Sequence, residues 1–389
     1  MLADYPMRRD HRSERVLKQP TGSFGAAAGF ADGPMGGWRA WLDNGVAGLY
    51  PGYFALVMAT GIISNAFFFM GWLALSNALF GINLIAYPVL LLMTLARIGD
   101  HPRVIWRDLT DPKIVFSFFT IVAASSVLGV QFDLRGVAAA ATVLWLFAFL
   151  VWFVLLYFSF SVLTFLNTAH DANVVHGGWL IAIVGTQSLV LLGARVAEHS
   201  LEAAGWIFIL IHMLWGIGIA LYGIFVTLFS YRIFFFEVEP KDVTPLHWVV
   251  MGAAAISANA GTTLILSESH LPFLQAMRPF VDGVTLIIWA WGTWWIPLLI
   301  VFGVWAHGIR KLSITYTPAL WSLVFPLGMY SLSTFRLSLA TQFPPLQNLG
   351  LALVWIAFAV WVATFIGMIR SLWRSRRASG DAQGPAIHS

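Results

Sequence analysis

The chain has 389 residues, of which 59% are apolar and only 10% are charged, and its formal net charge at pH 7 is +4. Soluble domains carry about 25% charged residues, and surface-to-volume scaling limits how much apolar surface one core can bury. These values exclude an ordinary soluble protein and predict an integral membrane protein. The sequence has no cysteine, which excludes disulfides and thiolate chemistry, and the small net charge gives no reason to expect a nucleic-acid partner.

The first 49 residues differ from the rest of the chain. Basic residues between Arg8 and Lys18 are followed by a Gly/Ala-rich stretch from Gly22 to Gly37. A signal peptide needs about 7–15 apolar residues after its basic start, and this stretch has none. We therefore expect residues 1–49 to be a largely disordered cytoplasmic tail that ends in a short interfacial helix at Trp38–Leu49.

Beyond the tail, the chain contains ten apolar runs of about 20 residues or more, which is the length a helix needs to cross a bilayer. We predict an all-α membrane domain over residues 50–370 and a cytoplasmic C-terminal tail over residues 371–389. The predicted spans are 51–70, 74–96, 113–131, 137–163, 177–196, 203–234, 246–266, 281–307, 318–341 and 347–369.

Lysine and arginine indicate the orientation of these spans. Eighteen of the 22 basic residues lie on the side that holds both termini, and four lie on the other side. Because basic residues concentrate in cytoplasmic loops, we expect both termini in the cytoplasm of a cell whose plasma membrane (the inner membrane of a bacterium) holds the protein.

The odd-numbered spans begin alike. Four of them start at a proline, at residues 51, 112, 245 and 318, and the fifth span starts at Gly177 after His176. Proline is favoured at the first position of a helix, so these residues read as the starts of five repeats, each one helical hairpin long. Tandem repeats of the same topology are related by an axis along the membrane normal. The repeat therefore predicts a quasi-five-fold ring around a central pore, with odd spans inside and even spans outside.

The composition of the spans agrees with this division. Odd spans carry small and weakly polar residues, whereas even spans are richer in large residues such as Trp289 and Trp291. If the ring forms, five helix N-termini meet at its cytoplasmic mouth, and such ends attract anions. An alternative explanation for the small residues is that they let helices pack closely.

Two stretches carry a resemblance to a known family. YPGYFALVMATG, from Tyr50 to Gly61, resembles the opening of the tellurite-resistance/dicarboxylate transporter family, and WSLVFPLG, from Trp321 to Gly328, resembles its ninth helix. The family includes bacterial tellurite-resistance channels, yeast malate permeases, sulfite efflux pumps and plant slow-type anion channels. The resemblance covers residues 45 to 370. It implies a homotrimer with one pore in each protomer, and a pore blocked at mid-membrane by the phenylalanine that matches Phe325.

Candidate site residues follow from the ring and from the resemblance. Phe325 is the predicted gate, and its alternative is a core or lipid-facing ring. Arg336 lies eleven residues later on the same helical face, and an arginine within a span is a candidate contact for an anion, the alternative being an interfacial anchor. Arg195 occupies a similar depth, with Glu198 or Glu202 as an alternative partner. The other predicted pore-lining residues are Thr60, Ser64, Ser126, Ser188, Asn259, Thr263 and Gly328.

The leading functional hypothesis is movement of a small anion, either a C4-dicarboxylate such as malate, or sulfite, a tellurite-type oxyanion, nitrate or chloride. Proton-coupled carriage or sulfite export by the same fold is the first alternative, and a membrane enzyme or sensor is the second. An enzyme would need clustered His, Asp or Glu within the spans, and we see none there. His212 is the one deep histidine and is expected to pack against its neighbours, so we predict neither a cofactor nor a metal site. The expected partners are the transported anions, the lipid bilayer and two further copies of the chain.

Overall fold

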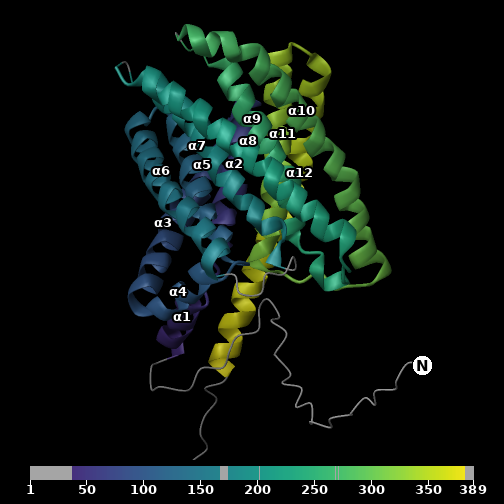
Figure 1. The fold of residues 1–389 in the computed structure, drawn as a ribbon. Helices are drawn as coiled ribbons and strands as arrows, with labels where there is room; N and C mark the ends of the chain where they lie inside the picture. The colour runs from purple at the N-terminus through teal and green to yellow at the C-terminus, as the bar shows by residue number, and fades with distance from the viewer. Residues whose placement is uncertain (1–36, 167–173, 201, 268, 270, 382–389) are drawn as a thin grey trace, which may run out of the picture. The chain divides into compact units, whose positions relative to one another are not determined.

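The computed structural model describes residues 37–166, 174–200, 202–267, 269 and 271–381. Within these residues, ten helices are long and apolar enough to cross a membrane, as predicted (Figure 1). The inner helices of the predicted ring are α2 (Ala55–Phe69), α5 (Phe119–Asp133), α7 (Ile181–Glu198), α9 (Val249–Leu266) and α11 (Trp321–Thr341). The outer helices are α3 (Leu73–Asp100), α6 (Ala138–Ser161), α8 (Ala204–Phe235), α10 (Pro272–Gly303) and α12 (Pro344–Asp381).

Each inner helix begins with a short 3-10 turn. These five turns are η1 (Pro51–Phe54), η2 (Val115–Phe118), η5 (Gly177–Leu180), η7 (Pro245–Trp248) and η9 (Pro318–Leu320). The turns η1, η7 and η9 begin with proline, which presets the backbone dihedral φ and has no N–H to leave unpaired, and in the second repeat Pro112 lies three residues before η2. The repeated turn shows that the five-fold repeat read from the sequence is also a structural repeat.

The third repeat lacks this proline and begins by a different device. The Nδ1 atom of His176 accepts a hydrogen bond from the Gly178 N–H at 3.0 Å, and its Nε2 atom donates to the Lys113 carbonyl oxygen at 2.7 Å. Together the two bonds require a neutral ring, and burial lowers the pKa of His176 in the same sense. The imidazole therefore caps this helix and ties it to the preceding repeat.

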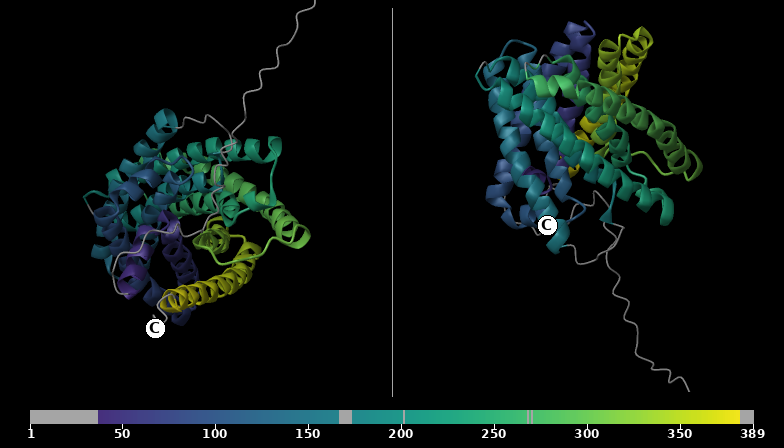
Figure 2. Two further views of the ribbon diagram at one scale, coloured as in Figure 1. Left: turned by 90° about the horizontal axis from the view of Figure 1, so that it is seen from below. Right: turned by 45° about the horizontal axis from the view of Figure 1, so that its top comes forward.

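The inner helices close into a ring. In turn, α2 packs against α5, α5 against α7, α7 against α9 and α9 against α11, and α11 packs back against α2 (Figure 2). In an apolar window of 18 residues taken from each span, 72–94% of the residues are buried in the five inner spans and 22–33% in the five outer spans. The prediction of odd spans inside and even spans outside is therefore confirmed.

Tryptophans of the outer helices attach them to the ring. Their indole N–H groups donate to polar atoms of an inner helix, which satisfies a donor that would be costly in apolar surroundings. These pairs are Trp145 with the Leu189 carbonyl, Trp152 with Thr186, Trp215 with the Ser257 carbonyl, Trp289 with Thr334, and Trp361 with Thr60. These five tryptophans, Trp289 of the even spans among them, thus have a structural role at the boundary between the two layers.

Shorter elements complete the fold. The helices α1 (Gly37–Ala47) and α4 (Pro102–Thr110) lie at the end where the inner helices begin, and both pack against α3 (Figure 1). The helix α1 confirms the short helix expected at 38–49, whereas α4 was not predicted. The π-helical segments η3 (Val162–Leu166) and η8 (Val304–Ile309) end α6 and α10, and η6 (Pro240–Asp242) precedes η7.

Two boundaries differ from the prediction. Helix α10 begins at Pro272 rather than at 281, because it continues through Pro279 instead of starting after it. Helix α12 continues from the predicted end at 369 to Asp381, since no proline interrupts its basic segment. Of the predicted tails, 1–49 and 371–389, residues 1–36 and 382–389 lie outside the described residues.

Candidate functional site

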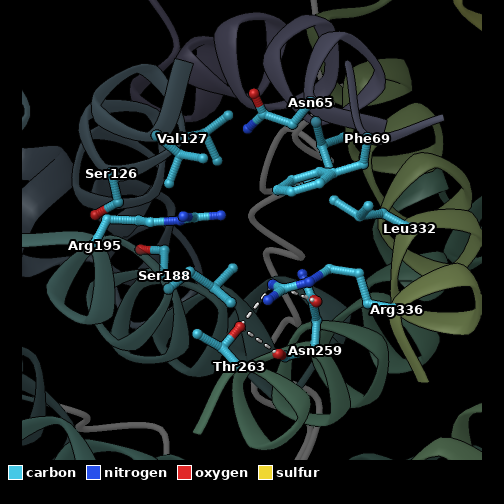
Figure 3. Close-up of a pocket in the computed structure, with 13 residues that line it drawn as sticks. Asn65, Phe69, Ser126, Val127, Ser188, Arg195, Asn259, Thr263, Leu332 and Arg336 are labelled. Atoms are coloured by element: carbon cyan, nitrogen blue, oxygen red, sulfur yellow. Dashed lines mark hydrogen bonds between the residues drawn. The ribbon is translucent and has the colours of Figure 1, made fainter. Parts of the chain in front are cut away.

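A cavity lies inside the ring and is lined by all five inner helices (Figure 3). Its volume is about 30 Å³, which is room for about two water molecules when each needs about 10–15 Å³. The lining consists of Ile62, Asn65, Phe69, Ser126, Val127, Val130, Ser188, Leu191, Arg195, Asn259, Thr263, Leu332 and Arg336. Polar and basic groups therefore meet at the axis of an otherwise apolar bundle.

The repeat determines ten of these thirteen residues. The first rung contains the residue 14 positions after each repeat start (51, 112, 177, 245 and 318), namely Asn65, Ser126, Leu191, Asn259 and Leu332. The second rung contains the residue 18 positions after each start, namely Phe69, Val130, Arg195, Thr263 and Arg336. A separation of four residues is about one helical turn, so each helix contributes one residue to each rung from the same face.

The polar residues of the two rungs lie on different helices. In the first rung they come from α2, α5 and α9, and in the second rung from α7, α9 and α11. Helix α9 alone contributes a polar side chain to both rungs, Asn259 and Thr263. An anion that moved between the rungs would exchange hydroxyl and amide partners for guanidinium partners while it stayed beside α9.

Arg336 is held at the cavity by neutral partners. Its Nη1 atom donates to Thr263 Oγ1 at 2.7 Å and to Asn259 Oδ1 at 3.2 Å, and its guanidinium lies 5.5 Å from the centre of the Phe69 ring. Across the described part of the chain, Arg336 forms no ion pair with a carboxylate. A charge in a membrane span is costly without a counter-charge, so this guanidinium favours an anion in the cavity.

Arg195 enters the cavity from the opposite side of the ring, as Figure 3 shows. In contrast to Arg336, it has acidic partners: its Nη1 atom lies 3.3 Å from Glu198 and its Nε atom 3.7 Å from Asp133. Its guanidinium also lies 5.9 Å from the centre of the Phe69 ring. Its charge is therefore offset in part by the protein itself.

Two buried polar side chains of the first rung are unsatisfied. Within the described residues, Ser126 Oγ and Asn65 Oδ1 have no hydrogen-bond partner, although their residues are only 1% and 3% exposed. Leaving such groups unpaired costs about 1–3 kcal/mol each. The serine can donate a hydrogen bond, and the asparagine Nδ2 atom lies on the cavity side of its amide in Figure 3, so its N–H groups can donate there. Both are thus available to a ligand in the cavity.

The structure brings together six of the ten residues predicted for the site. Arg336, Arg195, Ser126, Ser188, Asn259 and Thr263 all line the cavity. Of these, Ser188 is already satisfied within its own helix, because its hydroxyl donates to the Gly185 carbonyl at 2.7 Å. The other four predicted residues lie elsewhere in the ring.

Three of those four face neighbouring helices. Thr60 accepts the hydrogen bond from Trp361 at 2.9 Å, and the Ser64 hydroxyl donates to the Ser76 carbonyl at 2.7 Å. Gly328 packs so closely on α2 that an added Cβ would lie 2.9 Å from side-chain atoms of Ile62 and Ile63. Their positions give them roles in helix packing.

Phe325, the fourth, is 2% exposed and lies two helical turns before Leu332 on the same face of α11. It is seven positions after its repeat start, and the same position in the other repeats holds Met58, Phe119, Val184 and Gly252. All five residues are buried. We call them the apolar layer; it lies beneath the cavity, toward the N-terminal ends of the inner helices.

Several cavity residues were missed by the sequence analysis. Asn65, Phe69, Leu191 and Leu332 line the cavity but were not predicted to do so. Applying the 14- and 18-residue spacing to all five repeats would have found them, whatever their residue type. Selection by polarity alone could not find Phe69 or the leucines.

Other chemistry finds no support in the described segments. They contain no group of three or more His, Asp or Glu side chains that could hold a metal ion. His212 is hydrogen-bonded within its own helix, where its Nδ1 atom donates to the Phe208 carbonyl at 2.6 Å.

Comparison with known proteins decides the family. The voltage-dependent anion channel family matches residues 48–369, which is most of the chain and the whole ring. The chain belongs to the voltage-dependent anion channel family. An uncharacterized transporter of Methanocaldococcus jannaschii is 26% identical over 330 residues, which cover 82% of this chain and 94% of that protein. An uncharacterized membrane protein of Mycobacterium tuberculosis is 36% identical over 149 residues, which cover 38% of this chain and 75% of that protein.

Membership confirms the resemblance noted in the sequence. As a member of the voltage-dependent anion channel family, the protein is a multi-pass membrane protein that transports anions, and it is not an enzyme.

Proposed function

We propose that small anions cross the membrane along the axis of the inner ring and bind in the cavity between Arg195 and Arg336. The observation that carries the proposal is Arg336, a guanidinium within the ring whose hydrogen-bond partners, Thr263 and Asn259, are both neutral. An anion in the cavity would supply the missing counter-charge and could accept hydrogen bonds from Ser126 and Asn65. The substrate candidates are C4-dicarboxylates, sulfite, tellurite-type oxyanions, nitrate and chloride.

In the same proposal, the apolar layer closes the path when no transport occurs. A buried apolar constriction excludes hydrated ions by bulk and by dewetting, and Phe325 is its largest side chain together with Phe119. The proposal further places both termini in the cytoplasm of a plasma membrane and three copies of the chain in one assembly. Support for the orientation comes from the distribution of basic residues, and support for the trimer comes from the family resemblance.

Arg336 provides the test. Purified protein in liposomes should carry a current or an uptake of at least one anion of the candidate panel. Arg336→Ala should weaken the apparent affinity about tenfold or more, because a hydrogen bond to a charged group contributes about 1.5–3 kcal/mol. Arg336→Lys should retain part of the flux, since lysine keeps the charge but loses the two-pronged donor geometry.

Arg135→Ala is the matched control. Like Arg336, Arg135 is an arginine near the C-terminal ends of the inner helices. Unlike Arg336, it binds Asn77 and Ser76 and does not line the cavity. Its removal should leave the apparent affinity within about twofold, as expected for a distant screened charge. Normal flux and affinity in a well-folded Arg336→Ala protein would contradict the proposal.

A further inference from the structure

A titratable cluster lies where α5 and α7 end, next to the cavity. The Asp133 side chain is only 5% exposed and is contacted from two sides: His199 Nε2 lies 2.8 Å from Oδ1, and Arg195 Nε lies 3.7 Å from Oδ2. Arg195 reaches from this cluster into the cavity. The carboxylate is thus shared between a histidine outside the cavity and an arginine that lines it.

His199 can exchange protons with water. Its side chain is 48% exposed to solvent, and an imidazole becomes positively charged when it takes up a proton. Because the Asp133 carboxylate can only accept, His199 donates through Nε2–H in its neutral form, and a further proton goes to Nδ1. The hydrogen bond therefore survives protonation, and only the charge of the pair changes.

That one charge alters the balance around the cavity. With His199 neutral, the carboxylates of Asp133 and Glu198 cancel the guanidiniums of Arg195 and Arg336. Protonation of His199 leaves the group with a net charge of +1. The protonated imidazole of His199 also binds the Asp133 carboxylate more strongly than the neutral form does. The contact of Asp133 with Arg195, which is already the longer of the two, is weakened as a result. Less of the Arg195 charge is then offset, and the cavity attracts anions more strongly.

Among the described residues, no second histidine contacts the cluster of Asp133, Arg195, Glu198 and His199. Arg135 follows α5 and Glu202 precedes α8, and within the described residues neither forms an ion pair with Asp133, Arg195, Glu198 or His199. His212 of α8 donates through Nδ1 to the Phe208 carbonyl and could still be protonated at Nε2, but it does not line the cavity. Helix α6 has no charged residue, and the one titratable residue of the α9 span, His247, lies at its opposite end.

We propose that His199 and Asp133 form a proton-operated control of the anion site, in which protonation of His199 releases the Arg195 charge to the cavity and raises anion flux. This inference rests on the proposed function of the cavity. It assigns a regulatory role to two residues outside the cavity and predicts that acid on their side of the membrane stimulates transport.

The test measures chloride and nitrate flux per folded protein in liposomes from pH 8 to pH 5. Flux through the unsubstituted protein should rise about two- to fivefold toward pH 5, as expected for one unit charge at roughly 10 Å under partial screening. His199→Gln, which cannot be protonated, should keep the pH 8 flux at every pH. His199→Lys, which is charged throughout, should already have the raised flux at pH 8.

His101→Gln is the control, since His101 also pairs with an aspartate, Asp43 at 3.1 Å, but outside the cavity cluster. It should retain the pH response. A pH response that persists in folded His199→Gln, or a His199→Lys protein with unraised flux at pH 8, would overturn the inference and leave the proposed function intact. Absence of anion flux from the unsubstituted protein at every pH would instead refute the proposed function.

Discussion

Arg195 and Arg336 occupy the same position in two repeats, yet their surroundings give them different electrostatic roles. Arg195 shares its charge with Glu198 and Asp133, whereas Arg336 is bound by a hydroxyl and an amide. Removing Arg195 would leave Glu198 without its arginine and Asp133 with His199 alone. These surroundings support the proposal that Arg336 is the principal contact for the anion and that Arg195 is the one whose charge His199 adjusts.

At the same scale, substitutions at Phe325 can distinguish a role in gating from a role in packing. If its ring obstructs the path, Phe325→Ala should raise basal anion conductance at least severalfold, since truncation removes bulk without adding charge. Selectivity for anions should persist, because helix ends and arginines elsewhere supply it. Phe325→Leu should give a smaller increase. The measurement is conductance per folded molecule in planar bilayers or liposomes.

A purely structural Phe325 would behave differently. Truncation of a buried phenylalanine costs about 3–5 kcal/mol of stability, with a lower folded yield and no gain in conductance. Phe229→Ala provides the comparison, because Phe229 is 1% exposed but belongs to the outer helix α8. It should lower stability only. If Phe325→Ala resembles Phe229→Ala in both measurements, Phe325 is not the gate.

At the scale of elements, hydropathy predicted all ten spans because each is apolar over 19 residues or more and is bounded by charges or proline. The start of α10 was misplaced since Arg278, Pro279 and Asp282 resemble a loop in sequence, although the helix runs through them. The helix α4 was missed because it is short and half of its surface is charged or polar. The helical structure of such segments depends on tertiary contacts, which a hydropathy profile does not describe.

The direction in which a side chain points was the other information missing from the sequence. Thr60 and Ser64 are as small and polar as Ser126, but they bind Trp361 and Ser76 between helices rather than face the cavity. Residue type cannot separate these cases, because a hydroxyl can satisfy a neighbouring indole as well as line a pore. The spacing within the repeat does separate them, since Ser126 lies at the first-rung position and the other two do not.

An ion pair between elements fixes α4 beside α3. Arg97 donates to Asp108 at 2.6 Å and to the Ala47 carbonyl of α1 at 3.1 Å, and both charged side chains are under 8% exposed. Arg97→Ala should lower the free energy of unfolding by about 3–5 kcal/mol, because it leaves a buried carboxylate uncompensated. The melting temperature in detergent measures the change.

Arg107→Ala tests whether burial is the cause. Arg107 contacts the same carboxylate at 3.4 Å, but its side chain is 75% exposed, so its loss should cost less than about 1 kcal/mol. Equal effects of the two substitutions would show that the buried pair has no special importance for stability.

At the scale of the whole ring, the parallel arrangement of the inner helices makes its two ends electrostatically unequal. Helix N-termini carry about half a positive charge and C-termini about half a negative charge. The second rung lies near the C-terminal ends, where Phe69 is the last residue of α2. Anions would be repelled there without added positive charge. Arg195 and Arg336 supply that charge at the end where the helices themselves cannot.

The orientation of this unequal ring in the membrane is the last prediction. Position 240 lies between α8 and η7, and position 272 begins α10, so the single helix α9 separates them. Reporter fusions after residues 240 and 375 should report the cytoplasm, and a fusion after 272 the outside, because 18 of the 22 basic residues lie on the first side. Paired reporters active only inside or only outside measure this. Positions 240 and 272 on one side would contradict the ten-span arrangement, and a uniform reversal would place the arginine end of the cavity in the cytoplasm.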